Sequence, residues 1–358
     1  MQRTTRIVAV ATAAAALVAA LAAPSLSATR AGSTPSPTTK HPSAAAAGYL
    51  ARQLQGPHHD HYTVTFSGTV YPSYGETADA VLSMDAAGVA QRAAQRATTY
   101  LANNVAGYAA GSPTYYPGPV AKLMLVAVAQ HRSVRSFGGV DLVAKLQAAE
   151  GAGDAQPGEY QQNPGFPGGS SYIVSQALAV LALAIAPGAA QQPSAAAVSF
   201  LAGQQCADGG FQSTVRPDTG VACSGEDVDS AGYAVQALLA AGAKSASASG
   251  LTWLQHARNS DGGYGNPSNA NSTALAVEAL IAGHLRASRP IGWLRSHQIG
   301  CSGRSSRRGA VTFHGRYDAS ALLATSQAGA ALARKPLAWI DRGGAQAAAP
   351  VLACGSAG

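Results

Sequence analysis

The chain repeats one stretch of sequence, Asp227-Val-Asp-Ser-Ala-Gly-Tyr-Ala-Val-Gln-Ala-Leu-Leu-Ala-Ala-Gly242. It aligns without gaps on Asn269-Ala-Asn-Ser-Thr-Ala-Leu-Ala-Val-Glu-Ala-Leu-Ile-Ala-Gly-His284. It also aligns on Ser73-Tyr-Gly-Glu-Thr-Ala-Asp-Ala-Val-Leu-Ser-Met-Asp-Ala-Ala-Gly88. Looser copies cover 117–130, 170–187 and 317–332. Because the copies are rich in Ala and Leu, and several end on Gly, each predicts a helix.

Several copies also begin with a residue type that caps helices. These residues are Asp229, Asn271 and Asp318. A side-chain oxygen at the start of a helix accepts a hydrogen bond from a backbone N–H that has no partner inside the helix. We therefore expect these three side chains to be helix caps.

A second helix is predicted after each copy, and it often contains an aromatic–Leu pair. The pairs are Tyr49-Leu50, Tyr100-Leu101, Phe200-Leu201, Trp253-Leu254 and Trp293-Leu294. A unit of about 40–55 residues is typical of two-helix repeats, whose neighbours bury a continuous core. The helix around Tyr49 has no copy before it, so we expect it to complete the last hairpin and close a ring. An open solenoid would instead need polar caps at both ends.

The composition favours a helical fold. The chain has 358 residues, of which only 6% are aromatic while 47% are hydrophobic, so its core must consist mainly of small aliphatic side chains. Such side chains let helices approach closely and are unlike the β-branched residues of sheets. We predict one all-α domain over 46–358, with about six helical hairpins around a central cavity.

The N-terminus predicts export. Arg3 and Arg6 precede an uncharged apolar run over 7–23, and small residues follow, so we interpret 1–28 as a cleaved signal peptide. The alternative is a retained membrane anchor. Residues 29–45 are rich in Ser, Thr and Pro and predict a disordered leader. No later run is long enough to span a bilayer, so we expect a secreted protein that does not span the membrane after cleavage.

The four cysteines fit an oxidising compartment. Three pairings are possible, and we predict the nearest-neighbour one, Cys206–Cys223 and Cys301–Cys354. A metal site is the alternative, but the sequence has no CxxC spacing to support it.

The charge distribution argues against nucleic acid as a partner. The formal net charge is +7, and +5 without Arg3 and Arg6, but the basic residues are scattered and not interleaved with aromatics. The exception is the group Arg304, Arg307 and Arg308, which is either a solvated loop or a contact for an acidic polymer.

A family resemblance follows from two stretches. Phe200-Leu-Ala-Gly-Gln-Gln-Cys-Ala-Asp-Gly-Gly-Phe211 and the Asp227-Val-Asp-Ser segment after it resemble the repeats of the terpenoid cyclase and protein prenyltransferase toroid superfamily. In detail they are most similar to secreted actinobacterial proteins with prenyltransferase/squalene-oxidase repeats. The resemblance covers nearly all the chain from about Gly48 and implies an (α/α)6 toroid. It specifies the fold far better than the function.

The resemblance also supplies a candidate acid. Class II terpene cyclases carry an Asp-x-Asp-Asp motif whose middle Asp protonates an alkene, and Asp227 and Asp229 match its first two acids. Ser230 stands where the third would be, and the aligned copy reads Asn269-Ala-Asn271-Ser272, so a capping role explains both copies. A glycan lyase or hydrolase would need two facing carboxyls. Glu76 or Asp79 with Asp229 is the only pair that we nominate.

Three histidines and an acid form a possible metal site. His58, His59 and His61 surround Asp60, and these residue types bind metals. Neighbours in so short a stretch cannot all face one ion, so the alternative is a polar loop. We expect no cofactor.

Aromatic and polar side chains predict a ligand site at one mouth of the ring, because such cavities are the usual binding sites. The alternative is that each aromatic packs into its own hairpin, which we favour for Phe211 and Tyr264. The ligand-binding candidates are Tyr71, Tyr74, Tyr116, Lys122, Tyr233 and Tyr317, and further aromatics at the mouth are Tyr115, Tyr160, Phe166 and Phe313.

Two functional hypotheses remain. The first is a non-catalytic secreted protein that binds a small hydrophobic or isoprenoid-like ligand, or a cell-wall component, through the central cavity or the rim. The second is an enzyme, either of the terpenoid cyclase/prenyltransferase type or a toroid glycan lyase or hydrolase. We favour the first because the acid motif is degraded. Capture of cobalamin is a weaker third option, since no room remains for a second domain after Ile340.

Overall fold

The computed structural model describes residues 40–111, 115–152, 155–161, 171–188, 192–217, 220–343, 345–352 and 354. The predicted signal peptide, the leader up to residue 39, and Phe166 lie outside these residues. All the described residues belong to the compact unit that begins at Ser36.

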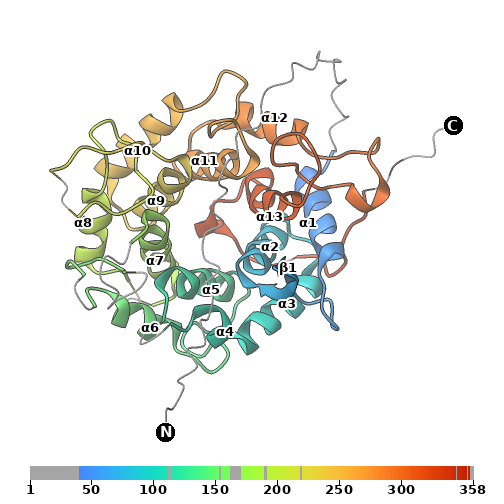
Figure 1. Ribbon diagram of the computed structural model, residues 1–358, viewed down its shortest axis with the longest axis horizontal. Helices are drawn as coiled ribbons and strands as arrows, with labels where there is room; N and C mark the ends of the chain where they lie inside the picture. The colour runs from blue at the N-terminus through green and yellow to red at the C-terminus, as the bar shows by residue number, and fades with distance from the viewer. Residues whose placement is uncertain are drawn as a thin grey trace, which may run out of the picture. The chain divides into compact units, whose positions relative to one another are not determined.

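Six of the described helices form a closed inner ring, as the repeats predicted (Figure 1). Each packs against the next, and α13 packs against α2. The inner helices are α2 (Tyr74–Ala87), α5 (Pro117–Ala129), α7 (Ile173–Ile185), α9 (Val228–Ala240), α11 (Ala270–Ala282) and α13 (Ala321–Leu332). All six repeat copies are therefore inner helices.

The second helices form an outer layer, and each packs on the inner helix of its own hairpin (Figure 1). They are α3 (Gln91–Asn103), α6 (Leu142–Ala149), α8 (Ala195–Gly203), α10 (Lys244–His256) and α12 (Ser288–Ser296), with the short α4 (Val105–Ala109) after α3. Helix α1 (Pro42–Gln53) packs on both α13 and α2, which confirms that the first helix closes the ring. It begins ahead of Ala46, our expected start, because Pro42 fits the first turn of a helix.

The helix caps differ from the expectation. Asp227, not Asp229, is the N-cap of α9, and it accepts a hydrogen bond from the Ser230 backbone N–H at 2.8 Å. Asn269 caps α11 in the same way, so Asn271, like Asp229, lies inside the first turn. The aligned copies thus share a capping device, but it is one half-turn earlier than we placed it.

The N-cap of α13 is Ser320, and Asp318 lies before the helix instead of capping it. Its carboxylate accepts a hydrogen bond from the Ser320 backbone N–H at 2.9 Å.

The glycine turns connect neighbouring repeats. Phe211 is fully buried, as we expected, and Asp208 accepts a hydrogen bond from the Trp253 indole of α10 at 3.0 Å. A Cβ at Gly210 would lie 2.8 Å from the same indole, so only glycine fits. The turn Asp261-Gly-Gly-Tyr264 repeats this arrangement with Trp293 of α12, and Tyr264 is also fully buried.

A β-hairpin, which we did not predict, lies between the loop at 57–61 and α2. Strands β1 (Tyr62–Phe66) and β2 (Thr69–Ser73) pair antiparallel, with Val64 opposite Tyr71. Ser67 and Gly68 both have positive φ, which the tight turn requires.

The C-terminal strap, residues 336–343 and 345–352, crosses the ring at the end where the inner helices finish. Two backbone hydrogen bonds attach the strap to inner helices. The Leu337 N–H donates to the side-chain oxygen of Gln236 on α9, and the Arg342 N–H donates to the carbonyl of Ala129, the last residue of α5. The backbone N–H of Gln346 then donates to the Gly88 carbonyl at the end of α2. Residues Leu337–Trp339 form the 3-10 turn η3, and Ser305–Arg307 form η2.

Both disulfides have the predicted pairing. Cys206 bonds Cys223 within one inter-helix loop, and Cys301 bonds Cys354, which attaches the end of the strap to the loop after α12. None of the described helices is long and apolar enough to span a membrane.

Candidate functional site

Charged side chains from several inner helices meet inside the ring. Lys122 of α5 donates to Asp79 of α2 at 2.7 Å, and both side chains are largely buried. Tyr233 of α9 and Glu278 of α11 are buried beside them. The structure therefore brings together three candidates from sequence, Asp79, Lys122 and Tyr233, and adds Glu278.

Glu278 was missed, although the repeat alignment held a signal for it. It aligns with Gln236 and Leu82, so a charge replaces a neutral residue at one inner-helix position. Burial raises the pKa of Glu278 well above its usual range, while a hydrogen bond from Gln236 lowers it and nearby Asp79 raises it further. Burial lowers the pKa of Lys122, but the attraction of Asp79 outweighs that effect and the net shift is upward.

The space at this cluster is small. A cavity of about 20 Å³ is lined by Asp79, Leu82, Ser83, Tyr233, Leu275, Glu278, Ser326, Gln327, Ala330 and Leu337. That volume holds about one water molecule. Leu337 belongs to the C-terminal strap, so the strap helps to fill the centre of the ring.

Asp229 has a raised pKa but does not line this cavity. Burial raises its pKa to about 6, a hydrogen bond from Ser272 lowers it, and the charge of Asp227 raises it. Its Oδ1 atom is buried without a hydrogen-bond partner among the described residues. Burial also raises the pKa of Glu76, which lies in the first turn of α2. Asp79, the other nominated partner for Asp229, is instead paired with Lys122.

The candidate tyrosines lie at several separate places. Tyr74 packs against Tyr100 and Tyr108, with ring centroids 6.0 and 5.6 Å apart. The Tyr317 hydroxyl is 3.1 Å from that of Tyr49 on α1. Tyr71 is exposed on β2, and Tyr116 is the half-buried N-cap of α5. Of these tyrosines, only Tyr233 lines the small cavity at the centre of the ring. The five side chains therefore do not form one binding site.

The larger cavity lies outside the ring, and we call it the outer groove. It has a volume of about 740 Å³ and runs between the loop at 57–61 and helix α3. Its lining residues are Pro57, His58, Asp60, His61, Arg92, Gln95, Arg96, Thr99, Tyr100 and Asn103. The loop joins α1 to β1 and contains the three histidines. From the sequence we expected these histidines to be either metal ligands or residues of a polar loop.

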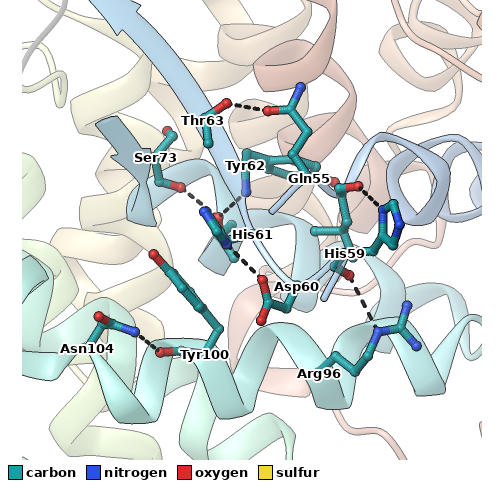
Figure 2. Close-up of polar contacts among 12 residues, drawn as sticks. Gln55, His59, Asp60, His61, Tyr62, Thr63, Ser73, Arg96, Tyr100 and Asn104 are labelled. Carbon is teal, nitrogen blue, oxygen red and sulfur yellow. Dashed lines mark hydrogen bonds and ion pairs between the residues drawn. The ribbon is translucent and has the colours of Figure 1, made fainter. Parts of the chain in front are cut away.

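One wall of the outer groove is a fixed His–Asp pair (Figure 2). Asp60 Oδ1 lies 2.7 Å from His61 Nδ1, and the imidazole stacks on the Tyr100 ring with centroids 4.0 Å apart. A Cβ at Gly56 would lie 2.8 Å from Nδ1, so the imidazole also packs closely against Gly56. The Arg96 guanidinium donates to the His59 carbonyl at 3.4 Å, which joins the loop to α3 (Figure 2).

The other wall is a polar stripe of α3 that the sequence analysis missed. Arg92, Gln95, Arg96, Thr99 and Asn103 are all exposed and recur at helical spacing. That spacing was readable from the sequence, but a polar face on an outer helix is usual and gave no reason to select it.

The three histidines do not form a shared metal site. Only His58 and His61 line the groove, and the His59 imidazole lies 3.3 Å from the Leu54 carbonyl. Within the described residues, Cys206, Cys223 and Glu226 are the one group of at least three candidate ligands that lie close together. The two sulfurs of that group are already joined to each other.

Comparison with known proteins shows the fold. No family model matches the chain, and no curated protein matches its sequence. Among solved structures, an ent-copalyl diphosphate synthase from Streptomyces platensis is 16% identical with a TM-score of 0.51; the match covers 73% of this chain and 50% of that one. This chain therefore spans only half of that enzyme.

Two further structures match over nearly their whole length. A type II terpene cyclase from Scytonema, in complex with geranylgeranyl dihydroxybenzoate, is 14% identical with a TM-score of 0.55, covering 83% of this chain and 96% of that one. An unsaturated glucuronyl hydrolase specific for heparin is 12% identical with a TM-score of 0.56, covering 82% and 95%. The chain therefore has the α/α-toroid fold that terpene cyclases share with a glycan hydrolase.

Proposed function

We propose that this protein is an exported, non-catalytic binding protein whose outer groove takes an acidic polymer of the cell surface. The observation that carries the proposal is the pair of exposed arginines, Arg92 and Arg96, that line the outer groove. Export rests on the predicted signal peptide at 1–28 and the leader at 29–45, together with the two disulfides.

The charges of the groove favour an anionic ligand. Its one carboxylate, Asp60, already faces His61, so its negative charge is engaged within the wall. Guanidinium groups bind carboxylates and phosphates through paired hydrogen bonds. Gln95, Thr99 and Asn103 add neutral donors and acceptors along the same stripe, which suits a polymer that carries hydroxyls as well as acids.

The size of the two cavities favours a polymer over a small hydrophobic ligand. The cavity at the centre of the ring holds about one water molecule, whereas the outer groove has a volume of about 740 Å³ and most of its lining residues are polar.

The test is a binding titration with polygalacturonate, polyphosphate and neutral dextran, each at two salt concentrations. We expect binding of an acidic polymer, no binding of dextran, and weaker binding at high salt. Arg92→Ala and Arg96→Ala should each reduce affinity roughly tenfold, since a hydrogen bond to a charged group contributes about 1.5–3 kcal/mol.

Arg132→Ala is the matched control, because Arg132 is exposed but lies in the turn after α5, outside the groove lining. It removes the same charge from the protein. If Arg132→Ala weakens binding as much as Arg96→Ala does, only net charge matters and the groove is not the site.

Two observations favour a second function, acid catalysis by Asp229. Its raised pKa of about 6 and its unpartnered buried Oδ1 suit a carboxylic acid that donates a proton. Turnover of a polyprenyl diphosphate or of an unsaturated glycan that is lost in Asp229→Asn would establish it. No turnover by the wild-type protein with either substrate class would dismiss it.

A further inference from the structure

Buried oxygens from three inner helices line the small cavity at the centre of the ring. Ser83 Oγ of α2, Glu278 Oε2 of α11 and Gln327 Oε1 of α13 have no hydrogen-bond partner among the described residues. Ser83 and Glu278 are 0% and 3% exposed, so bulk water does not satisfy them. An unsatisfied buried polar atom costs about 1–3 kcal/mol, so three at one place call for a common occupant.

The donor chemistry of these atoms restricts that occupant. The glutamate oxygen and the glutamine carbonyl oxygen are acceptors, and the serine hydroxyl can also accept. Asp79 and Tyr233 also belong to the lining of this cavity. Oxygen-only sets of carboxylate, carbonyl and hydroxyl groups are those that hard metal cations prefer.

The charge at the cavity selects a monovalent ion. The titratable groups beside Glu278 are Asp79 of α2, which is paired with Lys122 of α5, and Tyr233 of α9. The described helices α7 and α13 contain no titratable side chain. With Lys122 charged, Asp79 and an ionised Glu278 leave one negative charge, which one monovalent cation neutralises. A divalent ion would leave a buried positive charge, which is costly in a low-dielectric interior.

We propose that this cavity binds one monovalent metal cation, Na⁺ or K⁺, through Glu278 Oε2, Ser83 Oγ and Gln327 Oε1. The volume of about 20 Å³ admits a single particle of the size of a water molecule. The ion bridges α2, α11 and α13, so it stabilises the part of the ring where the last inner helix meets the first. The site is separate from the outer groove and does not depend on the proposed function.

The experiment measures the Tm of the full chain in NaCl, KCl and choline chloride at constant ionic strength. We expect the Tm to rise with the logarithm of Na⁺ or K⁺ concentration and to stay constant in choline. The rise should be lost in Glu278→Gln and kept in Glu226→Gln, since Glu226 is exposed and lies outside this lining. Sodium NMR should show broadening by the wild-type protein that Glu278→Gln removes.

Ser83→Ala keeps the test decisive if Glu278→Gln does not fold. It removes one oxygen ligand and should shift the Tm response to at least tenfold higher cation concentration. Three results would overturn the proposal. They are the same Tm response in choline as in NaCl, no response to either metal salt, or a larger response to Ca²⁺ or Mg²⁺ at lower concentration. The second of these would mean that a water molecule occupies the cavity.

Discussion

Helix α13 meets helix α2 at Gly329, and we expect a methyl group there to weaken the closure of the ring. A Cβ at Gly329 would overlap Ser83 Oγ and lie 2.8 Å from Ser83 Cβ. Both residues are buried. The Ser83 Cβ atom is attached directly to the backbone of α2 and cannot rotate away, so the two helices must separate. Overpacking of this kind costs about 1–3 kcal/mol.

Gly329→Ala also changes helix propensity, and a matched variant removes that contribution. Gly292 lies inside α12, and a Cβ there meets no atom within 4 Å. Gly292→Ala should therefore stabilise the protein by about 0.5–1 kcal/mol, from propensity alone. Because both variants gain that amount, the difference between them equals the steric cost, about 1–3 kcal/mol.

Urea denaturation followed by circular dichroism and tryptophan fluorescence measures both free energies of unfolding, and the m-values should agree. Adding Ser83→Ala to Gly329→Ala should restore part of the loss, because it removes the overlapping oxygen and leaves only the contact between Cβ atoms. Equal stability of Gly329→Ala and Gly292→Ala would refute the idea that these two helices touch at Gly329.

Three further predictions concern buried charge and the strap. Burial raises the pKa of Asp85 from 3.8 to about 6, so its ionisation in the folded state costs about 3 kcal/mol. The contribution of this group to stability is complete below pH 3.8 and is lost as the pH rises through about 6. Asp85→Asn should therefore flatten that part of the pH–stability profile and raise the free energy of unfolding at pH 8. An unchanged profile would contradict the assignment. Lys122→Met should cost about 3–5 kcal/mol by leaving Asp79 buried and unpaired, whereas adding Asp79→Asn should recover most of the loss in a double-mutant cycle; additive losses would mean that the two side chains are not coupled. Replacing Cys301 and Cys354 by serine opens a loop with a sequence separation of 53 and should cost about 4 kcal/mol in urea denaturation, so a loss under about 1 kcal/mol would show that the strap does not depend on this bond.

The repeats made the ring predictable because each copy has a similar pattern of helix-forming and apolar residues. The aligned segments at 227–242 and 269–284 both became inner helices, and the turn residues Phe211 and Tyr264 both became buried. Periodic sequence reports periodic structure, since each hairpin buries its apolar face on neighbours of the same kind.

The sites were less predictable because they depend on contacts between different elements. The hydrogen bond between Asp208 and Trp253 joins a turn to the following outer helix, and nothing in either segment alone indicates it. The outer groove likewise requires the loop at 57–61 to lie over α3, which local patterns do not specify. Asp229 shows a different kind of error, in which local sequence was over-interpreted. The repeat pattern suggested Asp229 as the cap of α9, but the cap is Asp227, two residues earlier.

The contact between α1 and α13 has a consequence for how this protein reaches its native state. The hydroxyls of Tyr49 and Tyr317 lie 3.1 Å apart although 268 positions of sequence separate them. An open solenoid can fold outward from any pair of neighbouring repeats, but a ring must bring its two ends together after the intervening repeats have formed. Contacts of such long range slow folding, because chain entropy is lost before the contact repays it. We therefore expect the joining of α1 to α13 to be late and rate-limiting, and partly assembled arcs to expose apolar helix faces until it occurs.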